Sequence, residues 1–238
     1  MLCAGRGSRL PKYFRKFPKC MIKINGKMII EYQQEFISKF KETIFITGYK
    51  SSKLKKFIET NNLKEIKNTK FGTTNMVYSM FLAKEKITTD VVVCYGDIFF
   101  NKTIYQKLKN NRTTIPIYTE WKSNWIERMG EKETLKDAED IQIKKNKVIS
   151  IGGKINKKKL PKYQYMGLIK IIKKDFLKMS NFFKKNKFSK IDMTTFLNAC
   201  IKQKIVEFDA IKYSDEWFEV DSNKDLKYFE TKLLSLKD

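Results

Sequence analysis

The segment Leu2-Cys-Ala-Gly-Arg-Gly-Ser-Arg-Leu10 stands at the start of the chain and decides how the rest is interpreted. Its first residues have the apolar character of a strand end, and two glycines follow. Glycine lets the backbone approach a ligand closely, and successive N–H groups can then surround an anion. The spacing fits neither the Walker nor the Rossmann glycine pattern. Two glycines also occur in simple turns, so alone they are weak evidence for a phosphate-binding loop.

Two cations favour the ligand-binding interpretation. Arg9 lies inside the segment, and Lys19 follows Pro18 a few residues later. Positive side chains beside a ring of backbone N–H groups suit the charge of a triphosphate. We therefore predict a nucleotide-binding loop that includes Leu2, Ala4, Gly5, Gly7 and Ser8, with Arg9 and Lys19 as its cations.

The composition is that of a globular protein. Of the 238 residues, 42% are hydrophobic and 13% aromatic, and none is histidine. Histidine bases and histidine metal ligands are therefore excluded, so chemistry must rest on carboxylates, lysines, backbone amides and an oxygen-bound metal. No apolar run approaches the ~20 residues that span a bilayer, and the start lacks the layout of a secretion signal. We expect one domain, 1–238, that is cytoplasmic and has no membrane partner.

The net charge of +24 raises the question of nucleic-acid binding. Nucleic-acid readers favour arginine for bidentate phosphate and guanine contacts, whereas lysine supplies most of the charge here. We therefore expect no nucleic-acid partner. A basic nucleic-acid-binding protein is the alternative from another functional class, and it predicts a steeply salt-sensitive affinity. The 50 basic residues include only five arginines, Arg6, Arg9, Arg15, Arg112 and Arg128.

Apolar residues alternate between strand-like and helix-like spacing along the chain. Strands and helices follow one another early, and hairpin-like strands come later. This order predicts an α/β fold, a Rossmann-like three-layer αβα arrangement around a mixed, mostly parallel sheet. A basic loop is expected over Lys154–Lys162. Helices are expected over 28–40, 51–60, 76–86, 174–185, 193–202 and from Ser222 or Asn223 to about Leu236, and strands over 1–4, 43–48, 63–68, 90–95, 114–119, 141–143, 148–151, 165–172 and 205–211.

Two aspartates follow strand-like segments. Asp97 comes shortly after the apolar run 90–95, and ligands of open α/β sheets bind outside the carboxyl ends of strands. In the segment 217–221, alternation places Glu219 and Asp221 on one face. Mg²⁺ prefers one or two carboxylates together with phosphate oxygens. Asp97 and Asp221 are therefore candidates for one magnesium site, although each could instead cap a turn or a helix.

Two tryptophans, Trp121 and Trp125, share one face if their segment is helical. Such a pair usually belongs to a hydrophobic core. Acidic residues nearby allow a second interpretation, a pocket in which aromatic rings and carboxylates hold an ammonium group. The residues of this candidate pocket are Glu120, Trp121, Trp125, Arg128, Asp137 and Glu139.

Taken in order, these segments resemble the nucleotidyltransferase superfamily that activates sugar-1-phosphates and choline phosphate. Leu2-x-Ala-Gly-x-Gly-Ser-Arg-Leu10 with Pro18-Lys19 is similar to its signature, and Tyr95-Gly-Asp97 and Glu219-Val-Asp221 are similar to its metal-binding segments. One branch comprises the cytidylyltransferases of the phosphocholine, 2-aminoethylphosphonate and phosphoglutamine type. The segments that resemble this branch are Thr74-Asn75-Met-Val-Tyr78-Ser79, Trp121-x-x-x-Trp125-x-x-Arg128, Asp137-Ala-Glu139, Ile151-Gly152, Tyr165-Met-Gly-Leu168 and Asp192-Met-Thr194.

The resemblance implies the nucleotide-diphospho-sugar transferase fold, CTP as donor, and transfer of CMP to a small phosphate or phosphonate headgroup with release of pyrophosphate. It implies that Asp97 and Asp221 hold Mg²⁺, while Lys19 and Arg9 neutralise charge. The acceptor would bind within 119–168, against the candidate pocket together with Tyr165 and Trp217. The further residues implied around the nucleotide are Asn75, Ser79, Tyr95 and Gly96.

Some features depart from the family pattern. Only Met1 precedes Leu2, so either the start is truncated or the sheet lacks part of its central strand, and Thr119 stands where the pattern has an aspartate. Segment 129–134 also differs from the Phe- and Pro-containing turn of the branch. The sequence thus leaves open a sugar-1-phosphate nucleotidyltransferase that uses another NTP, and a member that binds nucleotide without catalysis. It is also compatible with a homodimer.

Overall fold

The computed structural model of the protein describes residues 1–155 and 160–235. Part of the basic loop expected over Lys154–Lys162 therefore lies outside the described residues, and so does the predicted end of the last helix at Leu236. Within the described ranges, every helix falls short of the length and apolar character that a membrane crossing requires.

The first part of the chain forms a three-stranded parallel sheet in the order β1–β4–β5. β1 (Leu2–Cys3) pairs with β4 (Ile44–Thr47), which pairs in turn with β5 (Lys64–Lys67). A parallel bridge between Leu2 and Tyr95 joins this sheet to the next one. The loop that opens the sequence therefore begins where the two sheets meet.

The second sheet has seven strands in the order β6–β12–β8–β13–β10–β9, with β11 beside β8. β8 and β13 run parallel, and the other neighbours in this sheet run antiparallel. The strands are β6 (Val91–Cys94), β8 (Thr114–Tyr118), β9 (Glu139–Lys144), β10 (Lys147–Lys154), β11 (Gln164–Tyr165), β12 (Leu168–Ile171) and β13 (Phe208–Tyr213).

The α/β fold and the mixed sheet are confirmed, but parallel pairing is less extensive than the sequence suggested. Among the described residues, parallel pairing is confined to the first sheet, to the Leu2 bridge and to β8 with β13. The β9–β10 connection gives one reason. Lys145 and Asn146 both have positive φ, 48° and 60°, the geometry of a tight hairpin turn. Strands joined by so short a turn can pair only antiparallel.

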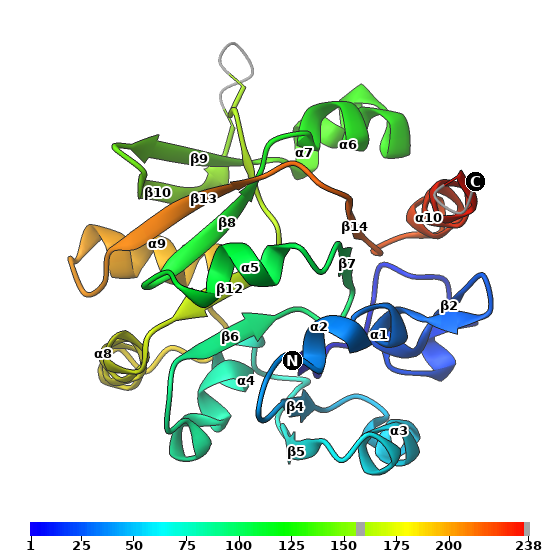
Figure 1. The fold of residues 1–238 in the computed structure, drawn as a ribbon, viewed down its shortest axis with the longest axis horizontal. Coiled ribbons are helices and arrows are strands. Elements are labelled where there is room, and N and C mark those ends of the chain that lie inside the picture. Colours follow the sequence, from blue (N-terminus) through cyan, green and yellow to red (C-terminus); the bar gives the residue numbers. More distant parts are fainter. Residues whose placement is uncertain (156–159, 236–238) are drawn as a thin grey trace.

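Helices cover both faces of the second sheet, which makes three layers (Figure 1). Val93 and Cys94 are neighbours on β6 and point to opposite faces, because side chains alternate along a strand. Val93 belongs to a core shared with α4, α8 and α9, and Cys94 to a core shared with α2, α5 and α6. The three-layer arrangement is thus confirmed. The covering helices are α2 (Gln34–Ile37), α4 (Met76–Leu82), α5 (Ile104–Lys109), α6 (Trp121–Met129), α8 (Lys173–Lys185) and α9 (Met193–Lys202).

The first expected helix is divided into α1 (Ile29–Tyr32) and α2. Gln33 separates the two, and it is only 1% exposed. Its Nε2 donates to the carbonyl of Tyr95 at 3.1 Å and to the carbonyl of Ile98. Gln33 thereby satisfies buried carbonyls of the turn after β6, a task that hydrophobic spacing cannot reveal.

Further elements complete the molecule, and several of them were not predicted. Among these, β7 pairs antiparallel with β14, which places Glu219 opposite Ile98. The unpredicted elements are β2 (Lys23–Ile24), β3 (Lys27–Met28), β7 (Ile98–Phe100), α5 and α7 (Glu131–Asp137). The others are β14 (Trp217–Glu219), α3 (Lys55–Thr60), α10 (Asn223–Ser235) and the 3₁₀ turns Phe14–Lys16, Lys19–Met21, Ser51–Lys53 and Lys84–Lys86.

Candidate active site

A cavity of about 310 Å³ opens where β1 and β6 end. Every residue that the sequence placed around the nucleotide lines it, and so do both candidate metal ligands. These residues are Leu2, Ala4, Gly5, Gly7, Ser8, Arg9, Lys19, Asn75, Ser79, Tyr95, Gly96, Asp97 and Asp221. The lining residues that sequence reasoning missed are Cys3, Cys20, Asn68, Phe71, Thr74 and Met76.

The loop after β1 forms one wall of the cavity. Gly7 has a φ of +60°, which glycine adopts without strain. Within the described residues, the N–H groups of Gly5, Gly7 and Ser8 donate to no protein acceptor, so they remain for a ligand or water. Arg15 fixes the loop, because its Nε donates to the carbonyl of Leu10 at 2.7 Å and its guanidinium also donates to the carbonyl of Ser8.

Gly96 brings the end of β6 against this loop. Its N–H donates to the carbonyl of Leu2 at 3.1 Å. A Cβ at position 96 would lie 2.5 Å from Sγ of Cys3 and 3.2 Å from the carbonyl oxygen of Leu2. Only glycine allows so close an approach. The next residue, Asp97, therefore reaches the cavity directly.

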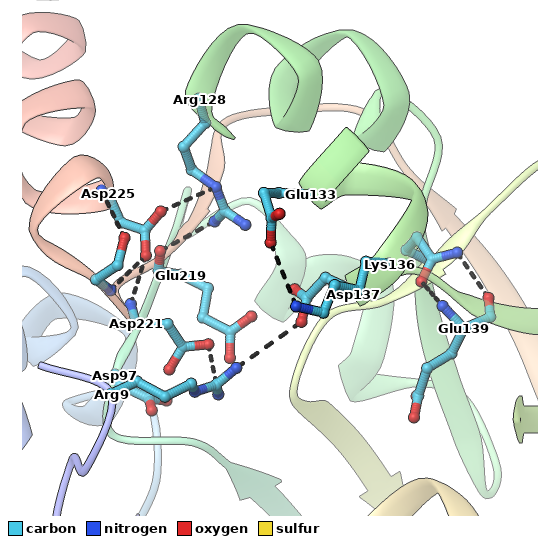
Figure 2. Close-up of polar contacts among 12 residues, drawn as sticks. Arg9, Asp97, Arg128, Glu133, Lys136, Asp137, Glu139, Glu219, Asp221 and Asp225 are labelled. Carbon is cyan, nitrogen blue, oxygen red and sulfur yellow. Dashed lines mark hydrogen bonds and ion pairs between the residues drawn. The ribbon is translucent and has the colours of Figure 1, made fainter. Parts of the chain in front are cut away.

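Three carboxylates, those of Asp97, Glu219 and Asp221, meet beside the cavity (Figure 2). The pairing of β7 with β14 brings them together, and the N–H of Val220 donates to the carbonyl of Asp97 at 3.1 Å. One oxygen from each carboxylate lies within 4.8 Å of the other two. A set of carboxylate oxygens at this spacing fits a hard divalent cation.

Lys19 and Arg9 lie against these carboxylates. Nζ of Lys19 is 2.6 Å from Oδ2 of Asp97 and forms a second ion pair with Asp221. A terminal nitrogen of Arg9 is 2.7 Å from Oδ2 of Asp221. Lys19 therefore already stands as a cation between the two aspartates.

The protonation of this cluster follows from its charges. Burial acts to lower the pKa of Lys19, but Asp97 and Asp221 outweigh burial and raise it. Burial acts to raise the pKa of Asp221, but Lys19 and Arg9 outweigh burial and hold it below the usual value. For Glu219, burial and then the charges of Asp221 and Asp97 raise the pKa well above the ordinary value. A divalent cation would relieve this repulsion, so the cluster attracts positive charge.

Polar side chains from the end of β5 and from α4 line another part of the cavity. Asn68 is 1% exposed, and its Nδ2 donates to Oγ of Ser79 at 3.0 Å and to Oγ1 of Thr74 at 3.1 Å. Asn75 caps α4, because its side-chain oxygen accepts from the N–H of Met76 at 2.8 Å. Asn68 was missed, although it directly follows a parallel strand, and that position was the available signal.

The three tryptophans expected to bind the acceptor lie inside the protein. Trp121, Trp125 and Trp217 are 1%, 4% and 1% exposed, and they belong to one hydrophobic core. Nε1 of Trp217 donates to the carbonyl of Met166 at 3.0 Å. None of the three lines the 310 Å³ cavity. Protein covers these rings, so the structure favours the core interpretation of the pair over the ammonium pocket.

Three other acceptor candidates contact Arg9, Thr194 and Tyr95. Asp137 is 3.8 Å from Arg9, which in turn contacts the cluster. Oε1 of Glu139 accepts from Oγ1 of Thr194 at 3.0 Å. The Tyr165 ring packs edge-on against Tyr95, with centroids 5.9 Å apart.

The last two candidates stand at opposite ends of α6. Glu120 is exposed, and its carboxylate accepts from Oγ1 of Thr119 at 2.9 Å. Arg128 is buried and forms an ion pair with Asp225 (Figure 2). The sequence pattern correctly placed Arg128 beside the tryptophans, but it could not show that the Arg128 guanidinium forms an ion pair with the Asp225 carboxylate.

Comparisons with known proteins find both cytidylyltransferases and sugar-phosphate nucleotidyltransferases. The profile of the MobA-like NTP transferase domain matches residues 1–129. The chain is 29% identical to the CTP:phosphoglutamine cytidylyltransferase of Campylobacter jejuni, over 95% of this chain and 96% of the relative. It is 29% identical to the choline-phosphate cytidylyltransferase of Streptococcus pneumoniae, over 50% of this chain and 53% of the relative. A solved CTP:phosphocholine cytidylyltransferase from Streptococcus pneumoniae shares the fold, with a TM-score of 0.77, 21% identity and coverage of 98% and 96%.

Proposed function

The chain belongs to the MobA-like NTP transferase family, and from this premise we propose that it is a CTP-dependent cytidylyltransferase. It transfers CMP to a small acceptor that carries a phosphate or phosphonate group and releases pyrophosphate. A relative that aligns along nearly the whole chain is a CTP:phosphoglutamine cytidylyltransferase. That alignment favours an acceptor of the phosphoglutamine type within a class that also includes phosphocholine and 2-aminoethylphosphonate.

One observation carries the proposal: the glycine loop, Lys19 and the paired aspartates converge on one cavity. The N–H groups of the loop and the cation Arg9 suit a triphosphate. Asn68, Thr74 and Ser79 offer hydrogen-bonding atoms to the nucleoside. A protein catalyses phosphoryl transfer mainly by positioning the reactants and by neutralising their charge.

We assign the divalent cation as Mg²⁺, held by Asp97 and Asp221 with Glu219 beside them. When bound there, Mg²⁺ neutralises phosphate charge and makes the α-phosphorus more electrophilic. Lys19 lies between the same aspartates, so it is placed to exchange these carboxylates for an oxygen of the α-phosphate. Its raised pKa keeps the ammonium charged for that task.

The reaction needs no general base. An oxygen of the acceptor phosphate forms a bond to the α-phosphorus of CTP, while the bond from that phosphorus to the bridging oxygen breaks. The electron pair leaves with pyrophosphate. Because a phosphate or phosphonate acceptor is already ionised at neutral pH, no side chain has to remove a proton, and a chain without histidine can perform this step.

The product is an activated headgroup. We propose that another enzyme later transfers this headgroup onto a surface glycan or lipid. The reaction takes place in the cytoplasm, where CTP is available. Neither a nucleic acid nor a membrane takes part.

The test combines the purified protein with each of CTP, UTP, TTP, ATP and GTP and with phosphoglutamine, phosphocholine, 2-aminoethylphosphonate or glucose 1-phosphate. Mass spectrometry then detects nucleotide conjugates. We expect CMP conjugates only with CTP and with a headgroup acceptor. A conjugate of glucose 1-phosphate would instead identify a sugar-1-phosphate nucleotidyltransferase. Nucleotide binding without any conjugate would identify a non-catalytic member, and steeply salt-dependent binding of DNA or RNA would favour the nucleic-acid alternative.

A further inference from the structure

Arg128 and Asp225 form an ion pair that is almost completely buried. Arg128 lies near the end of α6, and Asp225 lies in the first turn of α10. Their side chains are 3% and 4% exposed, and Nε of Arg128 is 3.2 Å from Oδ1 of Asp225. This contact is an ion pair without hydrogen-bond alignment, because the Nε–H has no hydrogen-bond acceptor among the described residues. The pair must therefore be held by its other contacts.

Those contacts reach the backbone on both sides of the candidate metal ligands (Figure 2). Oδ2 of Asp225 accepts from the N–H of Asp221 at 2.8 Å and from the N–H of Ser222 at 2.6 Å. A terminal nitrogen of Arg128 donates to the carbonyl of Glu219 at 3.0 Å. The pair thus holds the main chain of residues 219–222, from which the carboxylates of Glu219 and Asp221 project.

Helix capping explains only part of this arrangement. The bond from Asp225 to the N–H of Ser222 is half of an ordinary capping box. A capping box requires neither the bond to Asp221 nor a buried arginine from another helix. A buried ion pair is also weak evidence for a gain in stability, because desolvation opposes it. Its position against the carboxylate segment therefore calls for another explanation.

We infer that Arg128 and Asp225 are positioning residues that fix Glu219 and Asp221 for the divalent cation. This inference rests on the proposed function, since it assumes that these carboxylates bind the cation. Arg128 acts through the backbone of Glu219 and not on the acceptor. Because Arg128 belongs to α6, the pair also ties the helix that carries Trp121 and Trp125 to the cation site.

The test measures cation affinity directly with Mn²⁺, followed by electron paramagnetic resonance in the presence of CTP. Asp225→Asn keeps the size of the side chain and one acceptor oxygen but removes the charge. We expect it to weaken Mn²⁺ binding by about tenfold or more, as loss of a partner that orients a metal ligand does. CTP affinity without the metal should stay near the wild-type value, because neither residue lines the cavity.

Glu127→Gln is the matched control. Glu127 also lies on α6, and it contacts α10 through Lys232 at 2.9 Å and Tyr228 at 3.0 Å at the exposed surface. The control should bind Mn²⁺ as the wild type does. If Asp225→Asn leaves an unpaired buried arginine and does not fold, the double variant Arg128→Met/Asp225→Leu removes both charges and is measured in its place. Wild-type Mn²⁺ affinity in a folded variant overturns the inference.

The two proposals fail in different ways. A wild-type protein that binds Mn²⁺ but forms no CMP conjugate refutes the cytidylyltransferase activity. The Mn²⁺ affinity of Asp225→Asn relative to that of the wild type still tests the positioning role. A wild-type protein that forms CMP conjugates, together with an Asp225→Asn variant of normal Mn²⁺ affinity, refutes the positioning role alone.

Discussion

The N–H of Val220 donates a hydrogen bond of 3.1 Å to the carbonyl of Asp97. This contact continues the antiparallel pairing of β7 with β14, where Glu219 lies opposite Ile98. Asp97 thereby comes to lie beside both acidic residues of the later segment. The carboxylate cluster is thus a property of a two-stranded ribbon built from distant parts of the chain.

Loss of either aspartate should remove catalysis. We expect Asp97→Asn and Asp221→Asn each to lower kcat/KM for CMP transfer by about 10²–10³-fold, because an amide cannot neutralise a divalent cation. A Mg²⁺ titration of initial rates measures this effect. Glu59→Gln is the control, since Glu59 is 65% exposed and pairs only with Lys55 among the described residues. Undiminished magnesium-dependent turnover in either aspartate variant contradicts the metal assignment.

Replacement of Lys19 should separate metal binding from catalysis. In the structure Lys19 forms ion pairs with Asp97 and Asp221, so we expect it to compete with a cation for these carboxylates. Lys19→Met should therefore bind Mn²⁺ more tightly in the absence of nucleotide, while kcat falls by roughly 100-fold because the α-phosphate loses its cation. Paramagnetic resonance and initial rates measure the two effects. Lys16→Met, at a nearby exposed position in the preceding 3₁₀ turn, should change neither.

Two glycine substitutions should affect different properties, one the thermal stability and the other the affinity for CTP. Gly96→Ala places a Cβ 2.5 Å from Sγ of Cys3, so we expect a loss of about 1–3 kcal/mol and a drop in Tm of roughly 3–10 °C. Gly5→Ala meets nothing within 4 Å, so Tm should stay close to the wild-type value. CTP affinity should nevertheless fall, because the methyl group enters the loop that lines the cavity. Thermal melting with and without CTP distinguishes the two, and equal Tm values would refute the packing argument for Gly96.

The cap of α9 should make stability depend on pH. Burial acts to raise the pKa of Asp192, but hydrogen bonds from Thr195 and Thr194 outweigh burial and lower it. Because the folded-state pKa is the lower one, this stabilisation is present above the unfolded value of about 3.9 and is lost as pH falls through the folded value. Asp192→Ala should therefore cost about 1 kcal/mol at pH 7 and less below about pH 4. Urea unfolding of both proteins at pH 7 and at pH 3 measures the loss of unfolding free energy that Asp192→Ala causes. A larger loss at pH 3 than at pH 7 would contradict this prediction.

Stability and acceptor binding should respond to different residues. Trp121 is 1% exposed, so Trp121→Leu should lower the free energy of unfolding by about 2–4 kcal/mol. The KM for the acceptor should stay near the wild-type value in the folded enzyme. Asp137→Asn should instead raise that KM without lowering Tm, because Asp137 is exposed beside Arg9. A raised acceptor KM in Trp121→Leu at unchanged Tm would restore the aromatic-pocket interpretation.

Local signals in the sequence were enough for the loop and for the strand ends. The glycines, Arg9 and Lys19 lie within one short stretch, and Asp97 follows the apolar strand β6. These signals depend on backbone freedom and on side-chain period, which a sequence displays directly. The α/β class followed from the same periodicity. The extent of antiparallel pairing did not, because it depends on which strands return to which neighbours.

The tertiary structure alone decided how these pieces combine. Asp97 lies near Asp221 because β7 pairs with β14. Each of these strands has only three residues, too few to show a periodic pattern in the sequence. Trp121 and Trp125 are buried, which favours a core role over the candidate pocket, and Arg128 pairs with Asp225 on another helix. Spacing along one segment can place residues on a face, but the partner of that face is set by packing between segments far apart in the chain.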